Sequence, residues 1–282
     1  MILQKEIRKF SKEWNIPQDT VDKDYVLGHF LSEIYQHFED KIIFKGGTCL
    51  RKCYFPDYRF SEDLDFTARS KTFTLKNKSL KDICKNVENH SNILAIPEKI
   101  KQLEHEDRKM GYQVKLKYWG ANHSKSQQPT PSNRWVTKIK LEISLREKLI
   151  LTPNYREIYH PYSDSLSRSE PIPCYPLNEI VSEKIRALIQ RSYTAPRDFY
   201  DLYQLTNNLD KHAWIKIKEL LIKKMKHKGI EYRGPDQFVD NKTITHVRKA
   251  WETSIAHQVD SSNMPSPSVI INEVKERIEE YL

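Results

Sequence analysis

The spacing of apolar residues in the first part of the chain predicts a helix followed by a strand and a glycine turn. Between Val21 and Phe38 apolar side chains recur every three or four residues, which is the pattern of a helix with one buried face. The run KIIFKGG (41–47) then predicts a short strand that ends at paired glycines. Thr48 is the expected N-cap of the helical segment TCLRKCY that follows.

Alternating side chains predict further strands. A strand over 63–66 would direct the carboxylates of Asp63 and Asp65 to one face and two apolar side chains to the other. The clearest strand lies in WVTKIKLEISLRE. One of its faces carries Ile139, Leu141, Ile143 and Leu145, and the other carries Lys138, Lys140, Glu142 and Ser144. YQVKLKYW (112–119) is another strand, joined to it by the polar loop ANHSKSQQPTPSNR.

Most of the remaining chain has a helical pattern. The charged stretch from about Leu75 to Met110 is predicted to be mostly helical. Beyond the Pro-rich connector SEPIPCYP (169–176), apolar spacing predicts a helical domain almost to the end of the chain. Its segments are LNEIVSEKIRALIQR, RDFYDLYQL, WIKIKELLIKKM, ITHVRKAWETSIAHQ and VIINEVKERIEEYL.

Composition indicates a basic protein and the compartment in which it is expected. The 47 Lys and Arg exceed the 38 Asp and Glu, which leaves a net charge of +9. That surplus suits a polyanionic partner such as RNA or a phosphate-rich small molecule, although a basic but inert surface explains it equally well. No apolar run approaches the roughly 18 residues of a membrane span, so a soluble, cytoplasmic protein without membrane contact is expected.

Cysteine spacing does not indicate a structural metal site. Cys49, Cys53, Cys84 and Cys174 form no CxxC pair and do not cluster with His at zinc-like spacing. Free thiols in a reducing compartment are therefore expected.

The paired glycines Gly46 and Gly47 are the first candidate for chemistry. Without Cβ atoms, their backbone amides can approach an anion closely, as in a triphosphate cradle. Paired glycines also make ordinary turns, and this is the commoner reading of FKGGT alone.

Asp63 and Asp65 strengthen the phosphate interpretation. Two carboxylates on one strand face repel each other unless a cation lies between them. Mg²⁺ is commonly held by one or two carboxylates together with substrate phosphates, so an acidic pair beside a glycine turn predicts a metal site. The alternative for the acids is a solvated strand edge.

Glu142 is the candidate third carboxylate. On the polar side of its strand, it could bind metal or act as a general base toward an attacking hydroxyl. A surface pair with Lys140 is an equally good interpretation.

Lys184 falls within the apolar stripe of the helix LNEIVSEKIRALIQR. A lysine on a buried face needs a carboxylate or phosphate partner, unless it reaches the surface along its own stem. In RDFYDLY, Asp198 and Asp201 share one helical face. Either acid could pair with Lys184 or Arg186, or help to position a nucleotide.

Five pieces of the chain, taken in order, resemble the AbiEii/AbiGii nucleotidyltransferase toxins, a family that includes the MenT toxins. They are FKGGTCLRKCY, RFSEDLDF, KLEI, EKIRALIQR and RDFYDLYQL, and they span Phe44 to Leu205. The resemblance implies an α/β nucleotidyltransferase core of the polymerase-beta type, with a mixed sheet flanked by helices, over residues 1–165. It implies a helical C-terminal domain over 166–282.

The resemblance also implies a function. Such toxins belong to toxin–antitoxin or phage-defence systems, and characterised relatives add nucleotides to tRNA acceptor ends. A nucleoside triphosphate, an RNA acceptor such as the 3′ end of tRNA and a cognate antitoxin are therefore the expected partners, with Mg²⁺ or Mn²⁺ as cofactor.

Site residues follow by position from the same resemblance. The metal-binding pair corresponds to Asp63 and Asp65, with Glu142 as a further candidate ligand. The phosphate-binding turn corresponds to Lys45, Gly46, Gly47 and Thr48, with Ser61 beside it. The family lysine corresponds to Lys184, which would neutralise phosphate charge, and Asp198 corresponds to an acid that assists at the nucleotide. Two alternatives remain: a metal-dependent nuclease, and a nucleotide- or RNA-binding protein without catalysis.

Overall fold

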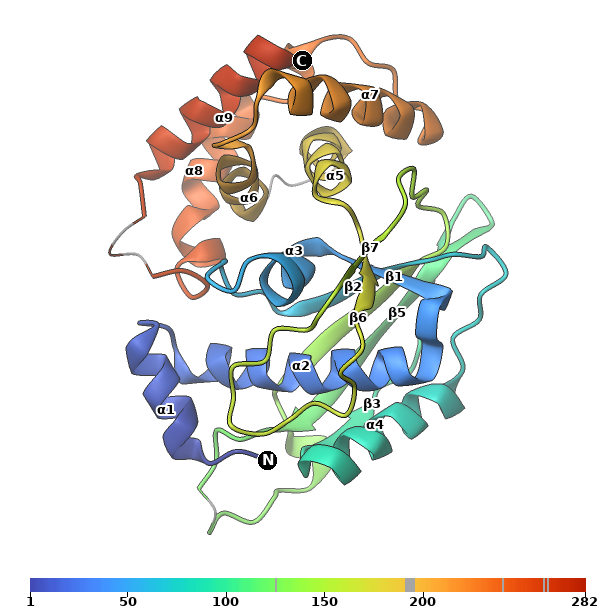
Figure 1. Ribbon diagram of the computed structural model, residues 1–282, viewed down its shortest axis with the longest axis vertical. Coiled ribbons are helices and arrows are strands. Elements are labelled where there is room, and N and C mark those ends of the chain that lie inside the picture. Colours follow the sequence, from blue (N-terminus) through green and yellow to red (C-terminus); the bar gives the residue numbers. More distant parts are fainter. Residues whose placement is uncertain (125, 191–195, 240, 261, 263) are drawn as a thin grey trace. The chain divides into compact units, whose positions relative to one another are not determined.

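The chain forms two compact units in the computed structural model, which describes residues 1–282 except 125, 191–195, 240, 261 and 263 (Figure 1). Unit 1 comprises Met1–Glu147 and Pro153–Cys174, and unit 2 comprises Lys148–Thr152 and Tyr175–Leu282. Compact packing alone does not show which part folds by itself, so the domains 1–165 and 166–282 stay a prediction.

Unit 1 combines helices with all eight strands of the sheet. Its helices are α1 (Gln4–Glu13), α2 (Gln18–Phe38), α3 (Gly46–Cys49) and α4 (Asn77–Ser91), with short turns η1 (Glu39–Lys41), η2 (Leu50–Tyr54, a π-helical turn) and η3 (Ser132–Arg134). Its strands are β1 (Ile42–Lys45), β2 (Asp63–Ala68), β3 (Leu94–Pro97), β4 (Lys101–His105), β5 (Arg108–Trp119), β6 (Lys138–Ser144), β7 (Asn154–Arg156) and β8 (Ile172–Cys174).

The sheet is mixed, which confirms the predicted fold class. Its order is β3-β5-β6-β2-β1-β8-β7, and β4 pairs with β5. Strand β2 runs parallel to β6 and antiparallel to β1, and β1 runs parallel to β8. The central strands β6, β2 and β1 therefore bring segments far apart in the sequence into adjacent positions.

Helix α2 covers one face of this sheet, with α4 beside it (Figure 1). The ring of Tyr35 on α2 packs edge-on against Phe66 of β2, which in turn packs on Phe44 of β1. Because side chains alternate along a strand, Asp63 and Asp65 point to the opposite face from Phe66. The predicted helix over 21–38 and the predicted direction of both acids are confirmed.

Three local predictions were wrong. The stretch from Leu75 to Met110 is helical only as far as Ser91 and then forms β3, β4 and the start of β5. Strands β4 and β5 meet at Glu106 and Asp107, both with positive φ, as in a tight hairpin turn. Strand β4 and the first residues of β5 are charged and mostly exposed, so they lack the alternation that identifies a half-buried strand.

The other two errors concern short segments. The connector 169–176 contains β8, a fully buried strand of three residues that is too short to show a period. Thr48 is not an N-cap, because α3 begins two residues earlier, at Gly46, with Lys45 in the capping position.

Unit 2 is helical, as predicted. It contains α5 (Leu177–Gln190), α6 (Pro196–Thr206), α7 (Lys211–His227), η4 (Pro235–Gln237), α8 (Asn241–Ile255) and α9 (Pro267–Tyr281). Position 191, the last of the predicted helix LNEIVSEKIRALIQR, lies outside the described residues. The core of unit 2 includes Phe199, Trp214, Phe238 and Trp251. Among the described residues of either unit, no helix is long and apolar enough to cross a membrane.

Candidate active site

A sharp turn connects β1 to α3, and glycine is required there. Gly46 has φ +83°, a left-handed conformation that side-chain-bearing residues rarely adopt. The hydroxyl of Thr48 donates a hydrogen bond to the carbonyl of Asp63, which ties the turn to β2. The predicted order of strand, glycine turn and helix is confirmed.

The side chains of β2 and of the segment before it surround this turn. A Cβ atom on Gly46 would lie 2.7 Å from Oδ2 of Asp65. A Cβ atom on Gly47 would lie 2.9 Å from Nη2 of Arg59 and 2.9 Å from Oγ of Ser61. The two glycines therefore leave room for one carboxylate, one guanidinium and one hydroxyl beside the turn.

The predicted carboxylates lie on one face of neighbouring strands. In the parallel register of β2 and β6, Asp63 pairs with Lys140 and Asp65 pairs with Glu142. Strand β1 lies next to β2 on the side away from β6, and its Lys45 pairs with Asp65 in the antiparallel register. Paired residues point to the same side of a sheet, so these five side chains share one polar face.

Lys140 lies among the acids. Its Nζ is 3.2 Å from Oδ2 of Asp63 and 3.8 Å from Oε2 of Glu142. The side chains of Lys140, Asp63 and Glu142 are each about a third exposed, so solvent and solutes can reach them. Glu142 also accepts a hydrogen bond from Gln113 (3.4 Å).

Burial and electrostatic repulsion both act on the carboxyl group of Asp65. Burial, reinforced by the neighbouring carboxylate of Asp63, raises the pKa of Asp65 to about 6. Burial alone would lower the pKa of Lys140, but Asp63, Asp65 and Glu142 outweigh it and raise that pKa. Three carboxylates thus share this face with the ammonium groups of Lys140 and Lys45.

These residues suit a hard divalent cation, since carboxylate oxygens are the ligands that Mg²⁺ prefers. Asp63 and Asp65 are the pair that adjoins the glycine turn. Within the described part of the chain, Asp63, Asp65 and Glu142 do not form a group whose oxygens all lie within 4.8 Å of one another. The role of Glu142 as a third ligand stays a prediction.

The predicted residues of the second half lie together in unit 2. Lys184 of α5 forms an ion pair with Asp201 of α6, and its Nζ lies 3.4 Å from Oδ1 of Asp198. All three side chains are largely buried. Of the alternatives left open for Lys184, the structure shows pairing with carboxylates and not a side chain that reaches the surface. The roles of Lys184 and Asp198 in catalysis stay predictions.

The chain matches a protein family over most of its length. The sequence profile of the family described as "Nucleotidyl transferase AbiEii toxin, Type IV TA system" matches residues 29–275. The chain belongs to the AbiEii family. It is therefore a nucleotidyltransferase toxin of the type IV toxin–antitoxin class.

A solved nucleotidyltransferase toxin shares the fold of this AbiEii chain. MenT4, a nucleotidyltransferase toxin from Mycobacterium tuberculosis H37Rv, superposes with a TM-score of 0.64 at 17% identity, covering 99% of this chain and 89% of that one. An antigenic nucleotidyltransferase-like protein from Paracoccidioides brasiliensis gives a TM-score of 0.34 at 12% identity, covering 74% and 89%. No protein with curated annotation matches the chain.

Two side chains at the AbiEii site were given no role from the sequence. Arg59 lies in the piece RFSEDLDF, two residues before Ser61, and is buried beside Gly47. Lys140 was considered only as a surface partner of Glu142. The period-two spacing of Lys140 and Glu142 in β6 is the available signal for their shared face, whereas Arg59 and Ser61 precede β2 and carry no such signal.

Proposed function

We propose that this AbiEii protein transfers a nucleoside monophosphate from a nucleoside triphosphate to an RNA acceptor, the 3′ end of tRNA. The observation that carries the proposal is the packing of the Asp65 carboxylate against Gly46. This packing places a metal-binding acid beside a phosphate-binding turn. Neither motif alone would indicate nucleotidyl transfer.

In this proposal the acceptor hydroxyl oxygen attacks the α-phosphorus, and the bond from that phosphorus to the β-phosphate oxygen breaks. Pyrophosphate leaves, and the hydroxyl proton passes to Glu142 or to water. Asp63 and Asp65 would hold Mg²⁺ or Mn²⁺, which when bound neutralises triphosphate charge.

The turn would orient the triphosphate before the reaction. Gly46 and Gly47 allow close backbone approach, while Lys45, Ser61 and Arg59 add charge and hydrogen bonds beside it. The hydroxyl of Thr48 already holds β2, so Thr48 is proposed to fix the shape of the turn. Fixed donors and charges of this kind stabilise the charge that develops during phosphoryl transfer.

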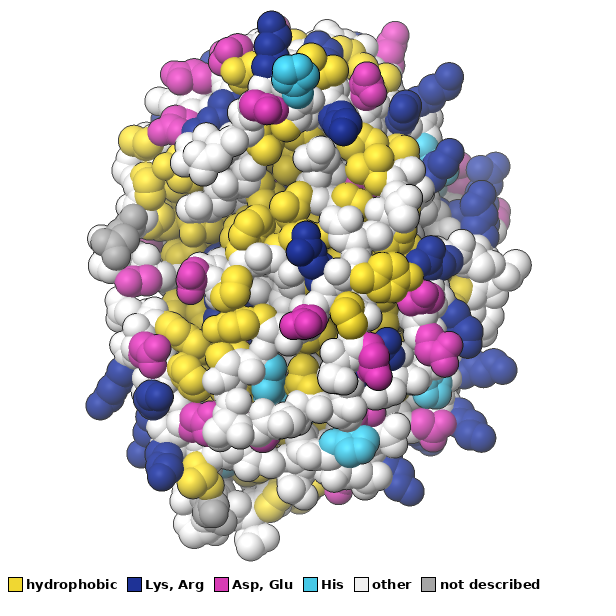
Figure 2. Space-filling view, viewed as in Figure 1, with side chains coloured by type: hydrophobic (Ala, Val, Ile, Leu, Met, Phe, Trp, Pro, Cys, Tyr) yellow, Lys and Arg dark blue, Asp and Glu magenta, His cyan; other side chains and the backbone are white. Residues whose placement is uncertain are grey.

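Charge supports an RNA acceptor. The chain has a net charge of +9, and Lys223 and Lys226 of α7 are exposed. On the face shown in Figure 2, Lys and Arg are interspersed with Asp and Glu and do not form one continuous patch. Contacts from scattered lysines to RNA phosphates predict binding that weakens steeply with salt.

One lysine of this part of α7 is not available to RNA. Lys224, between Lys223 and Lys226, is completely buried and pairs with Glu179 and Glu183. Only its exposed neighbours remain available to RNA.

The proposal is tested by incubating the purified protein with each labelled nucleoside triphosphate in turn, together with MgCl₂ and total RNA. Lengthened, labelled tRNA with release of pyrophosphate is the expected result. Asp65→Asn should lose this activity, and Glu104→Gln, an exposed acid on β4, should keep it. Shortened RNA would identify a nuclease instead, and labelled protein would remove RNA as the acceptor.

A further inference from the structure

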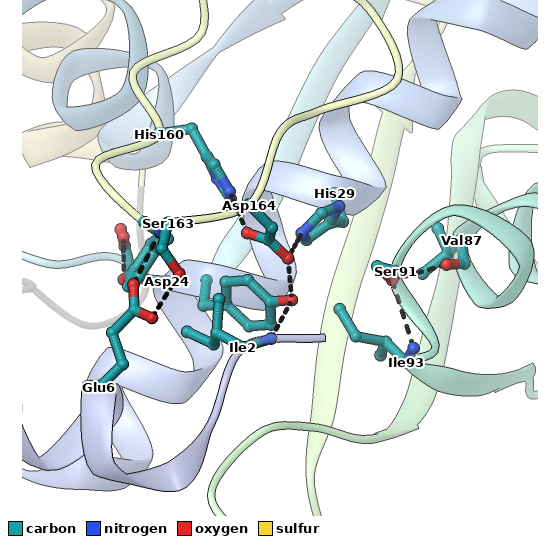
Figure 3. A network of polar contacts seen from close by, with 12 residues as sticks. Ile2, Glu6, Asp24, His29, Val87, Ser91, Ile93, His160, Ser163 and Asp164 are labelled. Carbon is teal, nitrogen blue, oxygen red and sulfur yellow. Dashed lines mark hydrogen bonds and ion pairs between the residues drawn. The ribbon is translucent and has the colours of Figure 1, made fainter.

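Two histidines and an aspartate meet on the side of unit 1 covered by α2 (Figure 3). His29 comes from α2. His160 and Asp164 come from an irregular segment, 157–171, which we call the strap. One ligand atom from each of the three residues lies within 4.8 Å of the others. None of them belongs to the polar face of Asp63 and Asp65.

The imidazole rings of His29 and His160 both face the carboxylate of Asp164. Nε2 of His160 lies 3.0 Å from Oδ1 of Asp164, and Nε2 of His29 lies 3.4 Å from Oδ2. His29 is only 3% exposed, yet its Nε2 makes no hydrogen bond. A buried nitrogen that faces a carboxylate without forming a hydrogen bond to it is a position that a bound cation would satisfy.

We propose that His29, His160 and Asp164 form a binding site for a zinc ion. Imidazole nitrogen and carboxylate oxygen are both ordinary zinc ligands, whereas Mg²⁺ favours oxygen alone. Ligands about 2.0–2.1 Å from a tetrahedral zinc lie about 3.3 Å from one another. The two nitrogen–oxygen separations, 3.0 Å to Oδ1 and 3.4 Å to Oδ2 of Asp164, are close to that spacing.

The surroundings of the triad suit a metal site. The hydroxyl of Tyr25 donates a hydrogen bond to Oδ2 of Asp164 (2.6 Å), as outer residues do for ligating carboxylates. Gly28 makes room for the ring of His160, because a Cβ there would lie 2.9 Å from Nδ1. The Asp164 side chain is 26% exposed, which leaves an entry path.

The zinc would hold the strap on α2. Apart from the triad, the strap is held on α2 by side-chain hydrogen bonds, such as those from Tyr162 to Asp24 and from the Arg168 amide to Ser32. The strap leads into β8, whose Cys174 pairs with Phe44 of β1 shortly before the Gly46 turn. The role assigned to this zinc is therefore structural. It positions β8, which lies beside β1, the strand that leads into the Gly46 turn.

Unit 1 offers a second group of soft ligands, and the experiment has to separate the two. The thiols of Cys49, Cys53 and Cys174 also lie within 4.8 Å of one another, although their sequence spacing did not indicate a cluster. Burial raises the pKa of Cys49 and Cys53 well above the usual value, whereas hydrogen bonds from Cys49 and Cys53 lower the pKa of Cys174 to about 5. The thiols of Cys49 and Cys53 must therefore lose protons before they can bind a cation.

The test uses the full chain, stripped with chelator and titrated with ZnCl₂ and then with CoCl₂, in excess MgCl₂ to occupy carboxylate sites. One zinc per chain is expected, with a cobalt spectrum that lacks the intense near-ultraviolet bands of thiolate ligation. His160→Gln and Asp164→Asn should weaken zinc binding by about 100-fold or more. Neither Cys174→Ala nor His123→Gln should change zinc binding. His123 lies outside the triad, and its ring is stacked on Trp119.

Tyr25→Phe keeps all three ligands and should weaken zinc binding by about 10–100-fold, so it decides the question if ligand variants fail to fold. Thermal unfolding gives a second readout, because zinc should raise the Tm of the wild type and not of His160→Gln. Zinc binding that is absent from the wild type, that persists in His160→Gln, or that is lost in Cys174→Ala would overturn the proposal.

Discussion

The carboxylate of Asp65 occupies the space that a side chain on Gly46 would need, with Oδ2 2.7 Å from the position of a Cβ atom. This contact depends on the antiparallel pairing of β1 and β2, which sets Lys45 opposite Asp65. The turn and the acid therefore act as one structural unit, and a change to either is expected to disturb the other.

Gly46→Ala is expected to abolish nucleotidyl transfer and to lower the free energy of unfolding. Alanine at φ +83° costs about 1–3 kcal/mol in backbone strain, and its methyl group would also displace Asp65. Urea unfolding and the transfer assay measure the two effects.

Gly229→Ala is the matched control for that variant. Gly229 has φ +69°, but a Cβ there would meet nothing within 4 Å. It should therefore show backbone strain of similar size with normal activity. Equal activity in Gly46→Ala and the wild type would remove the turn from the catalytic site.

Asp65→Asn is expected to be inactive and, in metal-free buffer at neutral pH, more stable than the wild type. The pKa of Asp65 is raised from 3.8 to about 6, so the folded state binds this proton more tightly than the unfolded state does. Wild-type stability should therefore fall as the pH rises from about 4 to about 6. Asparagine, which does not ionise, avoids a loss of about 1–3 kcal/mol.

Urea unfolding in EDTA at about pH 4, 6 and 8 measures this difference. Glu104→Gln serves as the control, because Glu104 is exposed and remote in sequence from the acidic pair. Added Mg²⁺ should close the gap by stabilising only the wild type. A gap between Asp65→Asn and the wild type that does not change with pH would contradict the expectation.

Periodicity predicted which way side chains point, but it could not supply their distant partners. The alternation around Asp63 and Asp65 gave both acids one face, and the structure agrees. The contact with Gly46 needs the register of β1 on β2, which lies beyond any local pattern. The triad is a stronger case, since His29 and Asp164 are brought together only by the path of the strap.

Errors in the predicted elements arose where tertiary context overrides local pattern. The β4–β5 hairpin turns through two acidic residues, Glu106 and Asp107, and its exposed strand looks like a charged helix in the sequence. Strand β8 contains Pro173 and is too short to show alternation, so only its pairing with β1 and β7 defines it.

Lys140→Met is expected to make the acidic face more dependent on divalent cations. Lys140 lies 3.2 Å from Asp63, and removing it leaves repulsion among the carboxylates. In EDTA the variant should lose about 0.5–1 kcal/mol, a modest value because the pair is about a third exposed. The stabilisation gained on adding Mg²⁺ should be larger than in the wild type.

Lys115→Met is the matched control for Lys140→Met. Lys115 pairs with Lys140 in the register of β5 and β6 but is exposed. Unfolding curves with and without Mg²⁺ should be unchanged for this control. If both variants respond to Mg²⁺ alike, Lys140 has no special part in balancing the acids.

Lys224→Met is expected to destabilise unit 2 without acting directly on RNA binding. The Lys224 ammonium is completely buried, 2.8 Å from Glu179 and 2.7 Å from Glu183. Removing one member of a buried charge cluster costs about 3–5 kcal/mol, because the remaining charges lose their partner. Glu179 still accepts hydrogen bonds from the amides of Ile150 and Leu151, which places the expected loss toward the lower end.

Lys223→Met separates stability from RNA binding. Lys223 is the next residue along α7 but is exposed, so its replacement should change the free energy of unfolding by no more than about 0.5 kcal/mol. If α7 contacts RNA phosphates, the same change should weaken RNA binding and reduce its dependence on salt. A Lys223→Met variant with unaltered affinity and salt dependence would exclude this position from the RNA interface and leave Lys224 with a purely structural role.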